Sequence, residues 1–245
     1  MENTPVIFLI ALKLPPDLYE RYRNWVREAY WPLLMKTPWL KGIDTHRIVK
    51  ENPEYNRSMS IFYFESLNHL ENFQNSPEYQ AWMKDVEASW AGRGEMVWNS
   101  VYKLIRNIKG SGPDISGENN TQESWIRHIE GYRFSQGDEE RYENWFARWG
   151  YDAFVPLLVR LPGLIEYARY KLIEFKWGYV AGLKFPAPGP ENISIFTFRD
   201  LEAFEKYEKS PELTSFRAAL DIYFPRGLDF KWYVQYCRSY GNWRE

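Results

Sequence analysis

The segment "ERYRNWVREAYWPLLMKTPWL", residues 20–40, decides the fold, because the chain repeats it as "ERYENWFARWGYDAFVPLLVRLPGL", residues 140–164. Both segments begin with ERYxNW and both reach PLLxxxP. The offset between the copies grows from 120 residues at the first motif to 124 at the second, so the second copy carries four additional residues. Four residues are about one helical turn. The insertion therefore either lengthens a helix while keeping its buried face or breaks that helix at Gly150.

The repeat extends well beyond this helix. "FESLNHLENFQNSPEY", residues 64–79, matches "FRDLEAFEKYEKSPEL", residues 198–213, and a β-rich run precedes each segment. An aromatic strand then closes each copy, which gives the order strand, helix, strand, strand, helix, strand. The segment "NIKGSGPDISGENNTQ" between the copies has the composition of a linker. We predict a first repeat at residues 1–108, a linker at 109–122 and a second repeat at 123–245.

The order of these elements is that of the ferredoxin-like split βαβ motif. Its sheet carries helices on one face only, so the other face needs a cover. The run "VIFLIAL", residues 6–12, is apolar at every position and therefore predicts burial on both faces. We predict the α+β class, with two ferredoxin-like βαββαβ repeats packed sheet to sheet as an intramolecular α+β barrel. Ser66 and Asp200 are the expected N-caps of the second helix in each copy.

Composition excludes several classes of function. The net charge is −2 without a long basic run, which argues against a nucleic-acid partner. The single Cys237 excludes an intramolecular disulfide and a cysteine-rich metal site. The apolar run near the N-terminus is too short to cross a membrane, and Glu2 stands where a signal peptide has basic residues. We expect a cytoplasmic protein without a membrane partner. Aromatic residues make up 18% of the chain, a proportion that suits pockets for flat apolar ligands.

Residues 30–49, "YWPLLMKTPWLKGIDTHRIV", and residues 154–173, "FVPLLVRLPGLIEYARYKLI", resemble the EthD-like group of the dimeric α+β barrel superfamily, here fused in tandem. That group has a His two residues before the Pro. This chain has Tyr30 and Phe154 there, so the resemblance implies that only the first copy could supply a hydrogen-bond donor, through the phenol of Tyr30. Some haem-binding members of the superfamily bind iron through a His in the second helix. The matching segments "SPEYQAW" and "SPELTSF" contain no His. We expect no cofactor and no haem.

The sharpest difference between the copies lies in their first strands. At an offset of 120, His128 and Glu130 replace Phe8 and Ile10. Residues two apart on a strand share a face, so an imidazole and a carboxylate should lie side by side. Such a pair could act as a general base, His128, oriented by Glu130. It could equally be a structural hydrogen bond or part of an exposed strand face.

The remaining candidates are ligand-binding residues. His46 shares a strand face with Asp44, and Tyr170 is its approximate counterpart in the second copy. Arg169 could anchor an anionic group. Trp145 and Trp149 belong to the helix-1 aromatic sets, which we expect to be mostly core, with some members lining a cleft between helix 1 and the sheet. The three His residues have no zinc-site spacing, so no metal site is predicted.

These observations predict the binding of a small apolar or aromatic metabolite. Any conversion would be cofactor-independent proton transfer, cyclisation or oxygenation. The alternative is a non-catalytic ligand-binding or structural protein. We further predict that the second copy holds the polar, ligand-selective pocket and that the first is mainly support. Assembly into homo-oligomers stays open.

Overall fold

The computed structural model of the protein describes residues 4–49, 58–90, 92–110, 125–133, 138–145, 148, 155–161, 163–173, 190–223 and 229–243. The chain divides into two compact units. Unit 1 comprises Met1–Leu104, Lys171–Gly189 and Arg238–Glu245, and unit 2 comprises Ile105–Tyr170 and Pro190–Cys237. Each unit therefore includes the end of a strand that begins in the other repeat.

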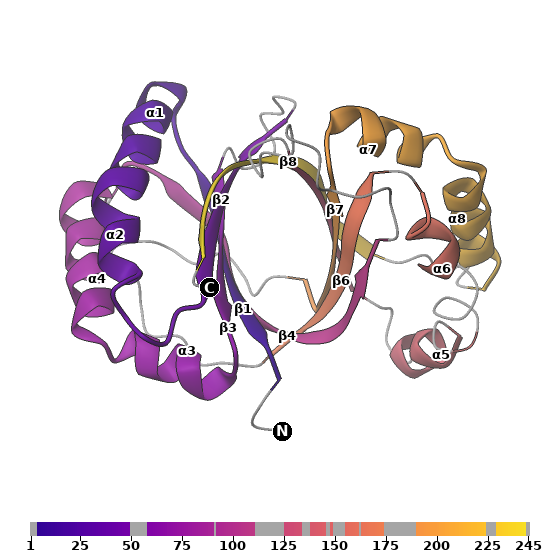
Figure 1. The fold of residues 1–245 in the computed structure, drawn as a ribbon, viewed down its shortest axis with the longest axis horizontal. Coiled ribbons are helices and arrows are strands. Elements are labelled where there is room, and N and C mark those ends of the chain that lie inside the picture. The colour runs from indigo at the N-terminus through magenta and orange to yellow at the C-terminus, as the bar shows by residue number, and fades with distance from the viewer. Residues whose placement is uncertain are drawn as a thin grey trace. The chain divides into compact units, whose positions relative to one another are not determined.

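Unit 1 contains a four-stranded antiparallel sheet in the order β4-β1-β3-β2. Its strands are β1 (Val6–Lys13), β2 (Gly42–Ile48), β3 (Ser58–Phe64) and β4 (Glu95–Lys109), the last of which ends in unit 2. Its helices are α1 (Pro16–Trp25), the π-helical turn η1 (Val26–Tyr30), α2 (Trp31–Leu34), α3 (Leu67–Gln74) and α4 (Pro77–Trp90). Figure 1 shows these helices covering one face of the sheet. The strand order is the one that the ferredoxin-like motif requires.

Unit 2 repeats the same order as β8-β5-β7-β6. Its strands are β5 (Ile126–Arg133), β6 (Leu164–Leu172), β7 (Asn192–Phe198) and β8 (Asp229–Trp243). Its helices are α5 (Asp138–Trp145), α6 (Val155–Leu158), α7 (Leu201–Glu208) and α8 (Pro211–Tyr223). The predicted α+β class and the ferredoxin-like order of both repeats are confirmed. Gly150 and most of the four-residue insertion lie outside the described residues.

Local sequence signals explain where the helices begin. Ser66 and Asp200 accept hydrogen bonds from the N–H groups of the residues three positions ahead, as predicted for N-caps. Helices α4 and α8 both begin at a proline, a position where the missing N–H costs nothing. Within the first helix, Pro32 cannot donate to the carbonyl four residues earlier. The helix widens into η1 just before it, and the Trp31 N–H bonds to the Val26 carbonyl, five residues back.

The core of unit 1 lies between its sheet and its helices. Val6, Phe8 and Ile10 of β1 belong to this core. Ile7 and Leu9, on the opposite side of the same strand, are equally buried. Two-sided burial of this strand is therefore confirmed. The predicted linker lies mostly outside the described residues, but its first residue, Lys109, still belongs to β4.

Candidate functional site

Unit 1 contains a cavity between its sheet and the helices α1, η1 and α4. Its volume is about 40 Å³. The lining residues come from β1, β3, these helices and two adjoining loop positions, and they are mostly aromatic or aliphatic: Ile10, Leu12, Leu14, Tyr22, Trp25, Tyr30, Ser60, Phe62, Trp82, Met83, Val86, Trp90 and Gly94. Among these residues no side chain carries a charge. The cavity is therefore suited to a neutral, apolar guest.

Aromatic side chains from α1, η1 and α4 contact one another in the cavity wall. Tyr30 meets Trp82 edge to face, with ring centroids 4.4 Å apart, and lies 4.5 Å from the ring of Trp25. Trp90 meets Tyr22 edge to face at 5.1 Å and lies 5.5 Å from Trp25. Trp25 thus links the two edge-to-face pairs. Such contacts fix ring orientations and leave flat surfaces on which another ring can stack.

The polar atoms of the cavity residues are mainly hydrogen-bond donors. Trp82 and Trp90 are 5% and 6% exposed, and their indole N–H groups have no hydrogen-bond partner among the described residues. Burial, together with the nearby Tyr22, Tyr79 and Asp85, raises the pKa of Tyr30 well above its ordinary value. The Tyr30 phenol therefore stays protonated at any physiological pH and remains a donor.

A hydrogen bond connects α1 and α4 at the exposed edge of the cavity. The Trp25 indole Nε1 donates to the Asp85 carboxylate at 2.9 Å, across a sequence separation of 60 residues. Asp85 also accepts from the Ser89 hydroxyl at 3.1 Å on its own helix. Because Trp25 also lines the cavity, this contact ties a wall residue of α1 to α4.

In unit 2, the predicted pair in the first strand is in contact. His128 Nε2 lies 3.0 Å from Glu130 Oε1, and the His128 side chain is only 1% exposed. The imidazole lies against two aromatic rings, Phe196 at 5.8 Å and Phe204 at 5.2 Å. The His128 ring is thus held among apolar side chains with a carboxylate fixing its orientation. The exposed-face interpretation of this pair is wrong for His128.

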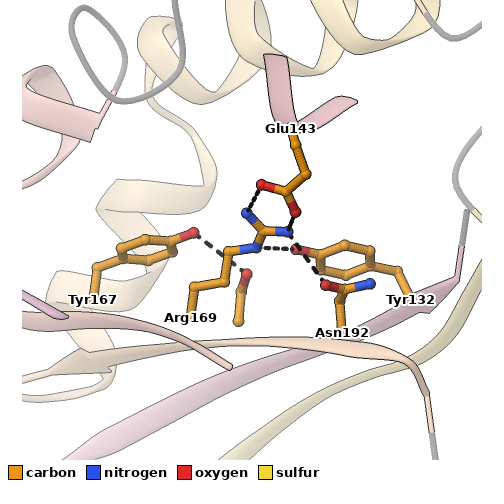
Figure 2. Close-up of polar contacts among 6 residues, drawn as sticks. Tyr132, Glu143, Tyr167, Arg169 and Asn192 are labelled. Atoms are coloured by element: carbon orange, nitrogen blue, oxygen red, sulfur yellow. Dashed lines mark hydrogen bonds and ion pairs between the residues drawn. The ribbon is translucent and has the colours of Figure 1, made fainter. Parts of the chain in front are cut away.

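A second polar cluster in unit 2 centres on Arg169 of β6, which is fully buried (Figure 2). Its two terminal nitrogens form a fork with the Glu143 carboxylate, one of them at 3.0 Å. Its Nε donates to the Tyr132 hydroxyl at 3.2 Å, and one terminal nitrogen also donates to the Asn192 side-chain oxygen at 3.2 Å. Tyr167 lies beside this group, with its hydroxyl 3.5 Å from the Ser194 hydroxyl. The cluster connects α5 to three strands of the sheet.

The charge on Arg169 is compensated within this cluster. Burial acts to lower the pKa of the guanidinium, but Tyr132 and the hydrogen bond to Glu143 outweigh it and raise that pKa well above its usual value. Burial and the nearby Tyr132 also raise the pKa of Tyr142, whose ring lies 5.4 Å from the guanidinium carbon. The side chain of Glu143 is 39% exposed. Arg169 is therefore permanently charged, and it is paired rather than available.

No family model and no curated protein matches the chain. Several solved structures do match the chain. A proposed monooxygenase from Fusobacterium nucleatum subsp. nucleatum superposes with a TM-score of 0.65 at 6% identity, covering 100% of this chain and 96% of that chain. An anthrone oxidase-like protein gives 0.60 at 12% identity, covering 99% and 94%. A mutant chlorite dismutase from Candidatus Nitrospira defluvii, in complex with cyanide, gives 0.57 at 10% identity, covering 98% and 92%.

These three likenesses extend over more than nine tenths of each chain. The chain has the α+β barrel fold. At such low identity the likeness concerns the fold alone, and the site must be argued from the residues of this chain.

The other site residues predicted from the sequence lie in different parts of the structure. Tyr30 lines the cavity of unit 1. His46 is buried in β2, one residue beyond Thr45, and alternation along the strand places it on the face opposite the helices. Tyr170 is likewise buried and follows Arg169 on β6. Trp145 ends α5 and lies 6.1 Å from the ring of Tyr142. Trp149 lies outside the described residues.

Two groups of residues were not predicted as site residues. Trp82 and Trp90 differ from their counterparts in the second copy, Phe216 and Phe224, and alignment on the Ser-Pro-Glu motif would have revealed that difference. Glu143 replaces Arg23 of the first copy, but its contact with Arg169 depends on how α5 packs on the sheet. Within the described part of the chain, no cluster of His, Cys, Asp and Glu side chains could hold a metal ion. None of the described helices is long and apolar enough to cross a membrane.

Proposed function

We propose that the protein binds a small, flat, apolar or aromatic molecule in the cavity of unit 1. The observation that carries this proposal is the composition of the cavity wall, in which six aromatic rings surround the space and no lining side chain is charged. Each ring face offers apolar area to a guest, and removing apolar surface from water contributes roughly 25 cal/mol per Å². A charged guest would lose its hydration without gaining a counter-ion.

The structural neighbours support a small-molecule function. They are described as a proposed monooxygenase, an anthrone oxidase-like protein and a chlorite dismutase. Each of these names refers to a reaction of a small molecule. The lining of the unit 1 cavity favours binding over acid–base chemistry at that place. Among its described lining residues there is no carboxylate or imidazole, and the phenol of Tyr30 is held in its protonated form.

Ligand entry requires the cavity to widen. At about 40 Å³ it is smaller than the roughly 150 Å³ of an engineered cavity that accepts benzene. The Trp25–Asp85 hydrogen bond is the contact to open, because it lies at the exposed rim and joins the two helices that flank the cavity. An exposed hydrogen bond of this kind stabilises by only about 1 kcal/mol, so breaking it to open the cavity requires little free energy.

Calorimetric titration with indane, a small bicyclic hydrocarbon, tests the proposal. Val86 lines the cavity, so Val86→Phe should fill it and lower the affinity at least tenfold. Ile222 of α8 is 75% exposed, so Ile222→Phe is a matched control that should leave the affinity unchanged. Binding that is insensitive to Val86→Phe would place the ligand elsewhere and contradict the proposal.

The buried pair in unit 2 favours a second candidate function, cofactor-independent proton transfer. Here His128 would be the base and Glu130 the residue that orients it, with their 3.0 Å contact as the supporting observation. Glu130→Gln keeps the shape of the pair but removes its charge. It should reduce turnover or binding of a substrate. Unchanged binding and turnover would identify the pair as structural, which corresponds to the non-catalytic alternative.

A further inference from the structure

We infer that the ligand of the unit 1 cavity is a neutral ring compound carrying a carbonyl-type hydrogen-bond acceptor, which the indole N–H groups of Trp82 and Trp90 bind. This inference rests on the proposed function and narrows its ligand class. An indole nitrogen can donate but cannot accept. Both indoles are buried, line the same cavity and have no partner among the described residues. A buried donor without a partner has lost its hydration, and a ligand oxygen would restore a hydrogen bond.

The other polar groups of the cavity point to the same ligand chemistry. Tyr30 lies edge to face against Trp82, and its phenol is a third donor on the same wall. The Ser60 hydroxyl lies 3.3 Å from the Thr45 hydroxyl, which already provides it with a partner in the sheet. Among the described lining side chains there is no charged group to pair with an ionic ligand. The wall therefore favours an uncharged molecule whose polar atom accepts hydrogen bonds.

The sequence of the second copy differs at the positions of these donors. At the positions of Trp82 and Trp90 it has Phe216 and Phe224, and at the position of Tyr30 it has Phe154. All three positions keep an aromatic ring and lose the N–H or O–H. The sequence of the second copy therefore lacks these three donors. The hydrogen-bonding groups are a property of the first copy alone, where the cavity lies.

Two probes of nearly equal shape test the inference, 1-indanone and indane, which differ by one carbonyl group. Calorimetric titration of the full chain should show 1-indanone binding about 10- to 100-fold tighter, from about three- to tenfold for each of two donors. The double variant Trp82→Phe/Trp90→Phe should abolish the preference, so that its affinities for 1-indanone and for indane become equal. Trp39→Phe, a residue packed against His69 rather than lining the cavity, is the control and should change neither affinity.

The outcomes separate the inference from the proposed function. If both probes bind equally tightly to the wild-type protein, the acceptor inference is wrong while the apolar site stands. If the preference for 1-indanone survives in the double variant, the indoles are not the donors and the inference is overturned. If neither probe binds, both the inference and the proposed function fail. If the double variant does not fold, the single variants Trp82→Phe and Trp90→Phe are titrated in its place. Thermal unfolding shows which variants are folded.

Discussion

The sequences of the two copies carry their polar residues at different positions of the repeat. In the strands, the first copy has mainly hydrocarbon where the second has polar groups: Phe8 and His128, Ile10 and Glu130, Leu12 and Tyr132, Thr45 and Arg169. At another set of positions the difference in residue type is reversed: Trp82 and Phe216, Trp90 and Phe224, Tyr30 and Phe154, Asp85 and Ala219. One backbone plan can therefore hold either arrangement.

The difference teaches how a duplicated fold can divide its tasks. In unit 1 a cavity lies between sheet and helices. In unit 2 the long Arg169 reaches across to Glu143 on α5 and connects helix to sheet. A buried ion pair of this kind holds two elements in one register, whereas a cavity leaves space for a guest. The account therefore assigns ligand binding to unit 1 and a fixed polar core to unit 2.

The largest effect is expected from separating the copies. A fragment of residues 1–110 lacks Lys171–Gly189 and Arg238–Glu245, which belong to unit 1. It would also expose one face of β1, which is buried on both sides. We expect aggregation or homodimerisation, measured by size-exclusion chromatography with light scattering. A soluble, well-folded monomer would show that the first copy is self-sufficient.

The next largest effect concerns the polar core of unit 2. Arg169→Met leaves the buried Tyr132 and Asn192 groups without their charged partner and should cost about 3–5 kcal/mol in the free energy of unfolding. Thr45→Val at the equivalent position of unit 1 removes the contact with the Ser60 hydroxyl and should cost about 1 kcal/mol in the free energy of unfolding. Urea denaturation measures both values. Equal costs would mean that the two sheets rely on polar contacts to the same extent.

A smaller effect on stability is expected at the turns that precede β2 and β6, where the two units differ. Gly163 has a positive φ of 85°, and a Cβ there would lie 2.4 Å from the Ala203 Cβ. Unit 1 has Trp39 and His69 at these two positions, with rings 5.5 Å apart. Gly163→Ala should lower the free energy of unfolding by about 2–3 kcal/mol. Backbone strain contributes roughly 1–2 kcal/mol, and the clash with the Ala203 Cβ contributes the rest.

Gly92 provides the matched control for this turn. Its φ is also positive, at 72°, but a Cβ there meets nothing within 4 Å. Gly92→Ala should therefore cost only the backbone strain, about 1–2 kcal/mol. Thermal unfolding of both variants measures the difference between them. Equal destabilisation would show that Ala203 moves aside without cost.

The smallest effect is a pH dependence at the cap of α7. Partial burial acts to raise the pKa of Asp200, but hydrogen bonds from the Ala203 N–H and from Arg199 outweigh it, and the pKa is lowered. The stabilisation is thus present above the unfolded pKa of about 3.9 and is lost as the pH falls through the lower folded value. Ser66, the equivalent cap in unit 1, does not titrate in this range.

The substitution Asp200→Ser tests this difference between the caps. It should cost at most about 1 kcal/mol at pH 7. It should also flatten the decline in stability on acidification from pH 5 to pH 3. Urea denaturation across that pH range measures the slope, and an unchanged slope would show that Asp200 makes no titratable contribution.

Much of the fold could be predicted from local patterns in the sequence. The repeat, the strand alternation and the Ser66 and Asp200 caps depend on neighbouring residues, and all appear where expected. The strand ends were less predictable. Residues 107–109 have the composition of a linker, yet β4 continues to Lys109, and the following Gly110 N–H bonds to the Ile165 carbonyl at 2.7 Å. Pairing with a distant strand outweighs local propensity there.

The candidate site was predictable only in part. The contact between His128 and Glu130 follows from the two-residue period of a strand, so the sequence sufficed. The pairing of Arg169 with Glu143 depends on how α5 packs on the sheet, which no local pattern encodes. The cavity beside Trp82 and Trp90 is a residual volume left by many side chains packing together. Such a volume cannot be read from residue types alone.

A crystal structure of the full chain soaked with 5-bromo-1-indanone tests the division of tasks most directly, because the anomalous signal locates the bromine without ambiguity. The account predicts a bromine inside unit 1, between α1 and α4, with the carbonyl oxygen within hydrogen-bond distance of the Trp82 or Trp90 indole nitrogen. A bromine beside His128 in unit 2, or well-ordered crystals without a bromine peak in unit 1, would contradict it.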